Sequence, residues 1–275
     1  MKTAVVNIGR LYTGDLQEPL DAADTVLMAD GVITRVGSAT AAEVEACDVV
    51  IDAAGATVAP GLIDSHVHIT FGDYTPRQQT VGFLESYLHG GVTTSISASE
   101  VHTPGRPKDR EGVKALAVAA YSCFRDYRPG GMRVHAGSII LEPALEVSDL
   151  AEIAAKGVWL AKAGFGAFAT PYDYAPFVAA AKEAGMVTTM HTGAASIPGS
   201  SGIWADHVIK VQPDVSFHVN GGPVAMPEAD FTRIVNESPV ALQICTAGNL
   251  RTALLVVRLA EEAGALDRVL IATDT

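Results

Sequence analysis

The stretch GLIDSHVHI, residues 61–69, joins a short apolar run to two histidines near its C-terminal end. His66 and His68 are two residues apart, so on an extended strand both imidazoles leave the same face. Pro60 and Gly61 separate this run from the preceding residues, as turn residues do where a new element begins. We therefore expect a strand here that ends in two side chains of metal-ligand type.

Seven more strand-like runs follow, at 91–97, 133–141, 157–165, 186–191, 214–219, 239–246 and 268–273. Between them, apolar residues recur at the i, i+3, i+4, i+7 spacing of helices that pack one face. Examples are Val113, Leu116, Ala117 and Ala120, then Tyr174, Phe177, Val178 and Ala181, and then Leu250, Ala253, Leu254 and Val257. Gly185 and Gly264 fall where such helices should end. Eight strands and seven helices in residues 61–275 predict an α/β fold, a (βα)8 TIM-type barrel.

Residues 1–60 have a different texture, in which short apolar runs alternate with turn residues. Asp30-Gly31 lies between two of the runs and is a strong signal for a β-hairpin. We expect this segment to be all β and to form a region separate from the barrel. Because Thr275 follows the eighth predicted strand directly, we expect a fragment whose barrel lacks its last helix.

Composition excludes several classes of protein. Apolar residues make up 48% of the chain and charged residues 18%, which excludes intrinsic disorder. The net charge of −12 disfavours nucleic acid as a partner. No window reaches the roughly 20 uncharged apolar residues of a membrane span, and no signal-peptide core is present. Since Cys47, Cys123 and Cys245 lie far apart, without a Cys-x-x-Cys pair, we expect a cytoplasmic location.

Side chains of metal-ligand type end several of the predicted strands. They are His66 and His68 on the first strand, His191 on the fifth, His218 on the sixth and Asp274 on the eighth. The C-terminal ends of barrel strands meet at one mouth, where catalytic groups sit. A lone histidine is more often a hydrogen-bonded structural residue. Four of the eight histidines and an aspartate on the same side favour a metal site.

Lys162 lies in the fourth strand-like run, where a buried cation is costly unless it is paired. The simple alternative is a lysine that reaches the surface. Burial lowers the pKa of an amine, and the neutral amine can capture carbon dioxide as a carbamate. Such an N6-carboxylated Lys162 is an anionic ligand that can bridge two divalent ions, with hydroxide as the second bridge.

The string APGLIDSHVHI, with His191, His218 and Asp274 at later strand ends, resembles the amidohydrolase superfamily of metal-dependent hydrolases. The resemblance covers nearly the whole chain. It implies that residues 1–60 are the N-terminal part of a composite β-sandwich and that residues 61–275 form the barrel. It also implies that His66, His68 and Asp274 hold one metal, that His191 and His218 hold a second, and that Lys162 occupies the bridging position. Zinc is the expected metal, and iron or manganese would also suit these ligands.

Four further strings resemble the branch of the superfamily that opens cyclic enamides. They are GDYTPRQ from Gly72, HTPGRPKD from His102, SIPGSS from Ser196 and HVNGGP from His218. We expect that branch to carry a glutamate at the bridge, so Lys162 departs from it toward the carbamylated-lysine branch of dihydroorotase-like and hydantoinase-like enzymes. The resemblance implies a homo-oligomer, a tetramer in this branch.

The expected reaction is hydrolysis of a carbon–nitrogen bond in a cyclic amide or enamide by a hydroxide that bridges two divalent metals. Asp274 is the expected catalytic residue: it would accept the proton of the attacking water and deliver it to the departing nitrogen. A mononuclear deaminase of the same superfamily is the alternative, and it would use His66, His68, His191 and Asp274 without a lysine bridge. A non-catalytic scaffold is a remote alternative, since it predicts that ligand residues are lost.

Substrate contacts are expected on the loops that face the mouth. Arg77, Arg106 and Lys108 would bind a carboxylate on the substrate. The alternative is that Arg77 is solvated at the start of a helix and that Arg106 pairs with Asp109. Hydrogen bonds to the developing oxyanion would come from Tyr74, Thr192 and Asn220, and His102 is a further candidate substrate contact.

Overall fold

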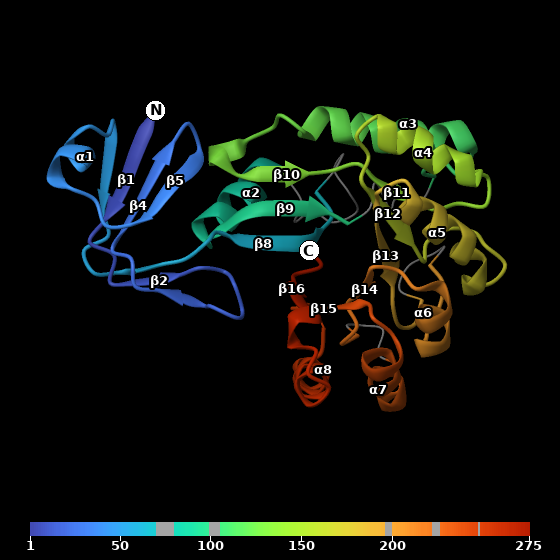
Figure 1. The fold of residues 1–275 in the computed structure, drawn as a ribbon. Coiled ribbons are helices and arrows are strands. Elements are labelled where there is room, and N and C mark those ends of the chain that lie inside the picture. The colour runs from blue at the N-terminus through green and yellow to red at the C-terminus, as the bar shows by residue number, and fades with distance from the viewer. Residues whose placement is uncertain (70–79, 99–104, 196–199, 222–225, 247) are drawn as a thin grey trace. The chain divides into compact units, whose positions relative to one another are not determined.

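A computed structural model of the chain describes residues 1–69, 80–98, 105–195, 200–221, 226–246 and 248–275. The chain divides into two compact units, Met1–Gly61 and Leu62–Thr275 (Figure 1). The change in sequence texture at Pro60-Gly61 therefore coincides with the change from the first unit to the second.

The first unit consists of two small sheets and one short helix. Its strands are β1 (Lys2–Val6), β2 (Arg10–Tyr12), β3 (Leu20–Asp21), β4 (Thr25–Ala29), β5 (Val32–Gly37), β6 (Val49–Asp52) and β7 (Thr57–Val58). The sheet orders are β5-β4-β1-β6 and β3-β2-β7. Asp30 and Gly31 turn the predicted hairpin β4–β5 with φ of +51° and +80°, a conformation that favours glycine. Buried Ile8, Leu11 and Val26 form the core of the unit.

The expectation that this unit is all β is wrong at one place, because α1 (Ala41–Glu45) is helical. Thr40 caps it, since its hydroxyl accepts a hydrogen bond from the Glu43 N–H while the Glu43 carboxylate accepts one from the Thr40 N–H. A Thr-x-x-Glu spacing is the sequence signature of this capping box. The signal was thus present in the sequence.

All eight predicted runs of the second unit form strands. They are β8 (Leu62–Val67), β9 (Val92–Ser97), the split pair β10 (Arg133–His135) and β11 (Ser138–Ile140), β12 (Leu160–Ala163), β13 (Val187–His191), β14 (Val215–Phe217), β15 (Ala241–Cys245) and β16 (Val269–Ala272). Their hydrogen-bonded orders are β10-β9-β8 and β11-β12-β13-β14-β15-β16, and every pairing is parallel. The third run is divided at Ala136 and Gly137, where Gly137 adopts a φ of +99°.

Backbone hydrogen bonds join the last strand of this series to the first. The Asp274 N–H donates to the His66 carbonyl at 2.9 Å, and the His68 N–H donates to the Thr275 carbonyl at 2.9 Å. The chain that leaves β16 therefore runs beside the end of β8, with residues some 200 positions apart in contact. This neighbour relation is the one that the expected barrel requires.

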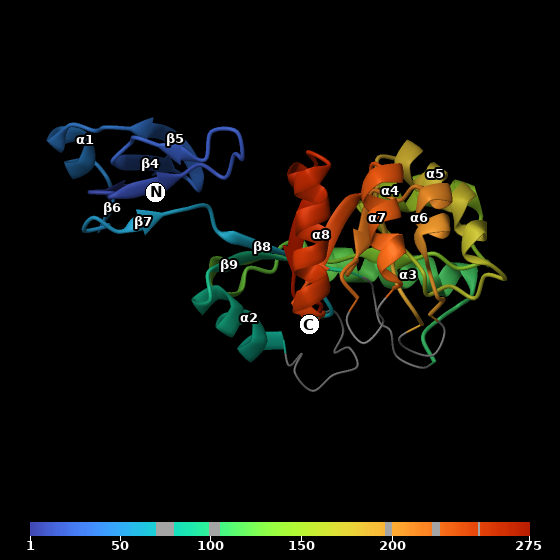
Figure 2. The same cartoon turned by 90° about the horizontal axis from the view of Figure 1, so that it is seen from below.

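Seven α-helices lie between these strands in the described part of the unit. They are α2 (Thr80–His89), α3 (Arg110–Phe124), α4 (Val147–Ala155), α5 (Ala175–Glu183), α6 (Ala205–Val211), α7 (Glu228–Glu237) and α8 (Leu250–Glu262). Figures 1 and 2 show α4 to α8 following one another around the outside of β11–β16. Gly185 and Gly264 follow α5 and α8 with φ of +78° and +65°, as predicted for helix ends. None of the described helices has the length and apolar character needed to cross a bilayer.

The predicted face of α8 is only partly right: Ala253 and Val257 pack against the core, but the two leucines of the predicted stripe do not lie on the buried face. The residues that the helix buries are Thr252, Val256 and Ala260, whereas Leu250 and Leu254 are 75% and 59% exposed. The sequence stripe began on a leucine, but the buried stripe begins two positions later and includes a threonine. The Thr252 hydroxyl compensates for its burial because it donates to the Asn220 carbonyl.

An ion-pair network ties α3 to α4 on the outside of the second unit. The carboxylate of Asp149 on α4 is 1% exposed and accepts hydrogen bonds from Arg110 Nε and Nη2, both at 2.8 Å. Lys114 Nζ lies 3.1 Å from the same carboxylate. Burial opposes ionisation of Asp149, but these cations and the N–H of Glu146 outweigh it and lower its pKa to about 2. The network is therefore a pH-dependent source of stability.

We expect Asp149→Asn to lower the free energy of unfolding by about 2 kcal/mol at pH 7. Because the folded-state pKa lies below the ordinary value, the carboxylate stabilises the fold above about pH 4, and this contribution is lost as the pH falls toward 2. Urea unfolding should show that the difference in the free energy of unfolding between wild type and variant is smaller at pH 3 than at pH 7. Glu237→Gln, in an exposed pair with Arg233, should change little. A pH-independent gap would contradict the assignment.

Candidate metal centre

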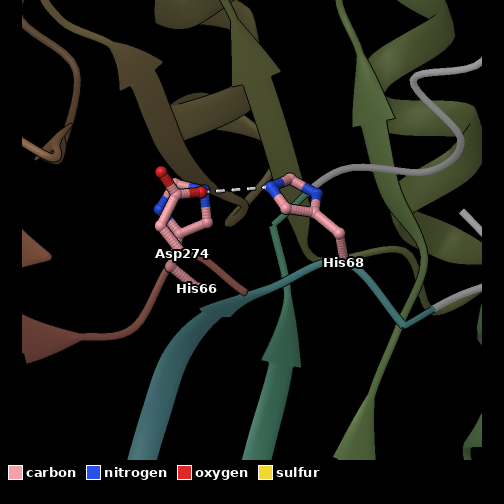
Figure 3. Close-up of side chains that lie close together, drawn as sticks. All are labelled: His66, His68 and Asp274. Carbon is pink, nitrogen blue, oxygen red and sulfur yellow. Dashed lines mark ion pairs between the residues drawn. The ribbon is translucent and has the colours of Figure 1, made fainter. Parts of the chain in front are cut away.

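His66, His68 and Asp274 converge where β8 and β16 end (Figure 3). His66 Nε2 lies 3.0 Å from Asp274 Oδ1, and His68 Nε2 lies 3.3 Å from the same oxygen. One potential ligand atom from each residue falls within 4.8 Å of the others. His66 and His68 reach this point from one strand because they are two residues apart. Two imidazole nitrogens and a carboxylate oxygen are a donor set suited to a divalent transition metal.

A second pair of histidines comes from β13 and from the residue after β14. His191 Nδ1 lies 3.1 Å from His218 Nε2. The second nitrogen of each ring contacts a backbone carbonyl. His191 Nε2 lies 2.8 Å from the Ala194 carbonyl, and His218 Nδ1 lies 3.0 Å from the Thr192 carbonyl. Each ring therefore directs its other nitrogen toward its partner.

Lys162 on β12 is 0% exposed, and its Nζ has no hydrogen-bond partner among the described residues. The amine lies 3.9 Å from the centre of the Phe217 ring and 5.4 Å from that of Phe165. Burial lowers the pKa of Lys162 to about 7, and the negative charge of Asp274 partly opposes this shift. A substantial neutral fraction of the amine near pH 7 meets the chemical requirement for carbamate formation.

The structure brings the six predicted ligand residues to the same end of the strands. The rings of His66 and His218 lie 5.6 Å apart between centroids, which connects the two histidine pairs. Phe217, next to His218, packs against both the His66 ring at 4.1 Å and the Lys162 amine. Close approach of β12 to β13 depends on Gly164, at φ +108°, because a Cβ there would lie 2.6 Å from the Cβ of His191.

Two of these residues have a backbone conformation that is uncommon for non-glycine residues. His218 has a φ of +39° and Asp274 a φ of +59°. His218 directly follows β14, and Asp274 lies two residues after the end of β16. Such conformations cost on the order of 1–3 kcal/mol and are concentrated at functional sites.

Burial and mutual charge set the protonation of this cluster. Burial lowers the pKa of His66, takes that of His191 to about 4 and holds that of His218 well below its usual value. Burial also opposes ionisation of Asp274, but the charge of His66 and the hydrogen bonds from His66 and His68 outweigh it and hold the carboxyl pKa well below its usual range. Neutral imidazoles and an ionised carboxylate are the forms that bind metals.

Three predicted substrate contacts, Tyr74, Arg77 and His102, lie outside the described residues. Lys108 is exposed on the segment before α3. Arg106 was expected to bind substrate or to pair with Asp109, and the structure shows neither. Its Nη2 lies 2.6 Å from Glu142 Oε1 and donates to the Phe165 carbonyl at 2.8 Å. Both charged side chains are nearly buried, which marks Arg106 as a structural ion-pair partner.

Thr192 and Asn220, the two predicted oxyanion contacts, are fully buried and already hydrogen-bonded. Thr192 Oγ1 donates to the Met190 carbonyl and shares a 2.6 Å hydrogen bond with Ser216. The Asn220 amide clamps Cys245, accepting from its N–H at 2.9 Å and donating to its carbonyl at 3.1 Å. In the structure, both side chains hold neighbouring segments of the protein together by these hydrogen bonds. Their expected contact with the substrate has no support in this geometry.

Sequence reasoning missed two buried polar residues close to the site, Gln243 and Glu142. Gln243 Oε1 lies 2.7 Å from His66 Nδ1. Glu142 follows β11, pairs with Arg106 and accepts the Ala167 N–H at 2.9 Å. Both could have been found from the sequence, because a polar residue in an apolar strand is expected to be buried with a partner. Gln243 lies within the apolar run ALQIC, residues 241–245, and Glu142 ends the run SIILE, residues 138–142.

Comparison with known proteins places the chain beside one group of hydrolases. No protein-family model matches it. Enamidase from Eubacterium barkeri is 46% identical over 274 residues, 99% of this chain and 71% of the relative. A crystal structure of enamidase, described as a new member of the amidohydrolase superfamily, aligns at a TM-score of 0.91 and 46% identity over 100% of this chain and 72% of that one.

A more distant structural neighbour is a mutant of the atrazine chlorohydrolase TrzN from Arthrobacter aurescens TC1, complexed with zinc and atraton. It aligns at a TM-score of 0.62 and 18% identity over 98% of this chain and 71% of that chain. At this identity the likeness concerns the fold alone. It agrees with the parallel α/β arrangement of the second unit.

We expect Arg106→Ala to lower the free energy of unfolding by about 3 kcal/mol, because it leaves the Glu142 carboxylate buried without its cation. Urea denaturation followed by circular dichroism measures this loss. Lys108→Ala, two residues away and exposed, is the matched control and should stay within about 0.5 kcal/mol of wild type. Unchanged stability of Arg106→Ala together with a raised KM would instead identify a substrate contact.

Proposed function

The chain belongs to the amidohydrolase superfamily, and on this basis we propose that it is a metal-dependent hydrolase that cleaves a carbon–nitrogen bond other than a peptide bond, in a cyclic amide or enamide. The observation that carries the proposal is the convergence of His66, His68 and Asp274 within 4.8 Å at the strand ends. The 46% identity to enamidase supports a cyclic enamide or a close relative as substrate.

The residues of the site fit a divalent metal. Asp274 Oδ1 faces Nε2 of both His66 and His68. Either protons on the two nitrogens or a cation bound between the three atoms would make these contacts favourable. The buried amine of Lys162, which contacts Phe217 as His66 does, has no hydrogen-bond partner among the described residues. Carboxylation of the amine would turn this orphaned group into an anionic ligand.

His66, His68 and Asp274 would hold one ion, His191 and His218 would hold a second, and carboxylated Lys162 would supply a further ligand to the pair. Zinc, iron and manganese each suit imidazole and carboxylate donors, and zinc is our first choice. When bound, two such ions would polarise a substrate carbonyl and lower the pKa of water toward about 7.

Asp274 is the residue that we propose moves the proton. Its carboxylate is ionised because its pKa is held low, and its side chain is 27% exposed at the end of β16. It can therefore reach a reacting group at the mouth, accept the proton of the attacking water and hand it to the departing nitrogen. His66 and His68 orient it by contacting one oxygen, Oδ1, which leaves Oδ2 for this transfer.

A mononuclear deaminase of the same superfamily is the second candidate. One observation favours it: among the described residues, the group whose ligand atoms lie within 4.8 Å contains only the three residues of the first ion. In that mechanism His191 would assist the single ion and Lys162 would stay unmodified. Metal stoichiometry separates the two candidates.

We further propose that the enzyme is cytoplasmic and homo-oligomeric, a tetramer by its resemblance to the enamide-hydrolysing branch. The three cysteines are free, which fits a reducing compartment. Residues 1–60 are proposed as the N-terminal part of a composite β-sandwich, with residues 61–275 as a (βα)8 barrel. Lys108 and Arg77 remain the candidate partners of a substrate carboxylate.

Asp274→Asn should reduce kcat on a cyclic enamide about 1000-fold, since proton transfer contributes roughly 10²–10⁴-fold. Thermal unfolding should show that the variant remains folded. Asp267→Asn, an exposed aspartate on the same segment of chain, is the control and should keep wild-type activity. Near-normal turnover of Asp274→Asn would remove the assigned proton carrier. Absence of turnover by wild type over a panel of cyclic amides and enamides would contradict the proposed reaction class.

Metal content and the mass of Lys162 test the two-metal proposal directly. We expect two divalent ions per chain by elemental analysis, and a labile adduct of about 44 Da, one carbon dioxide, by native mass spectrometry at neutral pH. Lys162→Met should lose the adduct and at least one ion, while Lys108→Met should lose neither. One ion per chain with an unmodified Lys162 would favour the mononuclear deaminase.

A further inference from the structure

Gln243 is a buried polar side chain that the proposed mechanism does not use. It lies on β15, is 0% exposed and makes two short hydrogen bonds. Its Oε1 lies 2.7 Å from His66 Nδ1, and its Nε2 donates to Ser65 Oγ at 2.8 Å. β15 pairs with β16, and backbone hydrogen bonds join the chain after β16 to the end of β8, so the contact between Gln243 and His66 reaches across β16. Gln243 therefore holds two consecutive residues of β8 from a distant part of the chain.

The amide has one donor and one acceptor group, and the two are committed to different partners. Because Nε2 donates to Ser65, the atom that faces His66 is the oxygen, which can only accept. The Sγ of Cys245 lies 3.7 Å from the same oxygen and 3.9 Å from His66 Nδ1, and its S–H donates to the oxygen. The hydrogen of a neutral His66 must then lie on Nδ1. When a cation takes the place of the proton between Nε2 and Asp274, this tautomer leaves the lone pair on Nε2 to bind that cation.

We propose that Gln243 is a positioning residue that selects the Nδ1–H tautomer of His66 and holds Nε2 toward the metal centre. A neutral imidazole binds a metal through its unprotonated nitrogen, and the hydrogen bond at the other nitrogen sets both tautomer and ring orientation. The inference rests on the proposed function, since it requires His66 to be a ligand. Gln243 acts through His66 and does not touch the reacting atoms.

Burial gives this hydrogen bond its influence. Both His66 and Gln243 are at most 1% exposed, so water cannot replace the amide oxygen if it is removed. The ring would then keep a buried, unpartnered N–H or would turn to find another partner, and either change weakens the ligand. Partners of this kind typically change metal affinity by roughly 10- to 100-fold when they are lost.

The test compares three variants of the full chain. Gln243→Leu removes the acceptor, Gln243→Glu keeps an acceptor facing Nδ1, and Ser65→Ala removes only the hydrogen bond on the far side of the amide. Zinc affinity is measured on metal-stripped protein by competition with a chromophoric chelator. We expect Gln243→Leu to bind zinc about 10- to 100-fold more weakly, and both other variants to stay within about threefold of wild type.

A spectroscopic measurement accompanies the affinities. Long-range ¹H–¹⁵N spectra of the histidine rings should show His66 of the zinc-loaded wild type protonated at Nδ1. Far-UV circular dichroism establishes that each variant is folded. If Gln243→Leu does not fold, the role of Gln243 is tested by the histidine-ring spectrum of wild type and by the zinc affinity of Gln243→Glu.

The outcomes separate this inference from the proposed function. Wild type that binds no zinc, iron or manganese overturns the proposed function and this inference with it. Wild type that binds zinc, with equal affinity in Gln243→Leu, overturns only the role of Gln243. Two other results also overturn the role of Gln243. One is a His66 ring protonated at Nε2 in the zinc-loaded protein. The other is a Gln243→Glu variant whose zinc affinity falls by about 10- to 100-fold, as expected for a His66 ring without its acceptor.

Discussion

The hydrogen bonds between the end of β16 and the end of β8 are the constraint on which the candidate site depends. The N–H of Asp274 donates to His66, and the N–H of His68 donates to Thr275. These bonds place an acid from the last strand against two imidazoles from the first strand. Without them the carboxylate oxygen could not face both ring nitrogens at about 3 Å. A backbone interaction thus fixes the geometry of side-chain chemistry.

Burial then determines the chemical state of the groups that this geometry collects. It favours neutral imidazoles and lowers the pKa of Lys162, while the histidines around Asp274 keep that acid ionised. The same apolar surroundings that make these groups costly to bury make them strong ligands, because water does not compete for them. Phe217, which packs against both Lys162 and His66, contributes to that exclusion.

Sequence analysis predicted the strands and the convergence of the histidines well, because both follow from short periodic patterns and from the rule that parallel strands end together. It did not find the structural partner of a residue where that partner lies far away in the chain. Arg106 was assigned to substrate because nothing nearby showed that Glu142 neutralises it. Asn220 was assigned to the oxyanion because its clamp on Cys245 exists only once β14 and β15 are neighbours. On α8, the leucines were predicted to lie on the buried face. Thr252 lies there instead, because its hydroxyl donates a hydrogen bond to the Asn220 carbonyl.

The separation of His66 and Asp274 in the chain has a consequence for synthesis. A nascent polypeptide leaving the ribosome can pair its early strands with one another, but β8 can meet the chain that follows β16 only after some 200 further residues have been made. During that interval the two imidazoles of β8 lack their acid, and any cation bound to them would be held by a partial ligand set. A complete set of His66, His68 and Asp274 therefore forms only after β16 has been made, and its formation depends on the slow closure of a long-range contact.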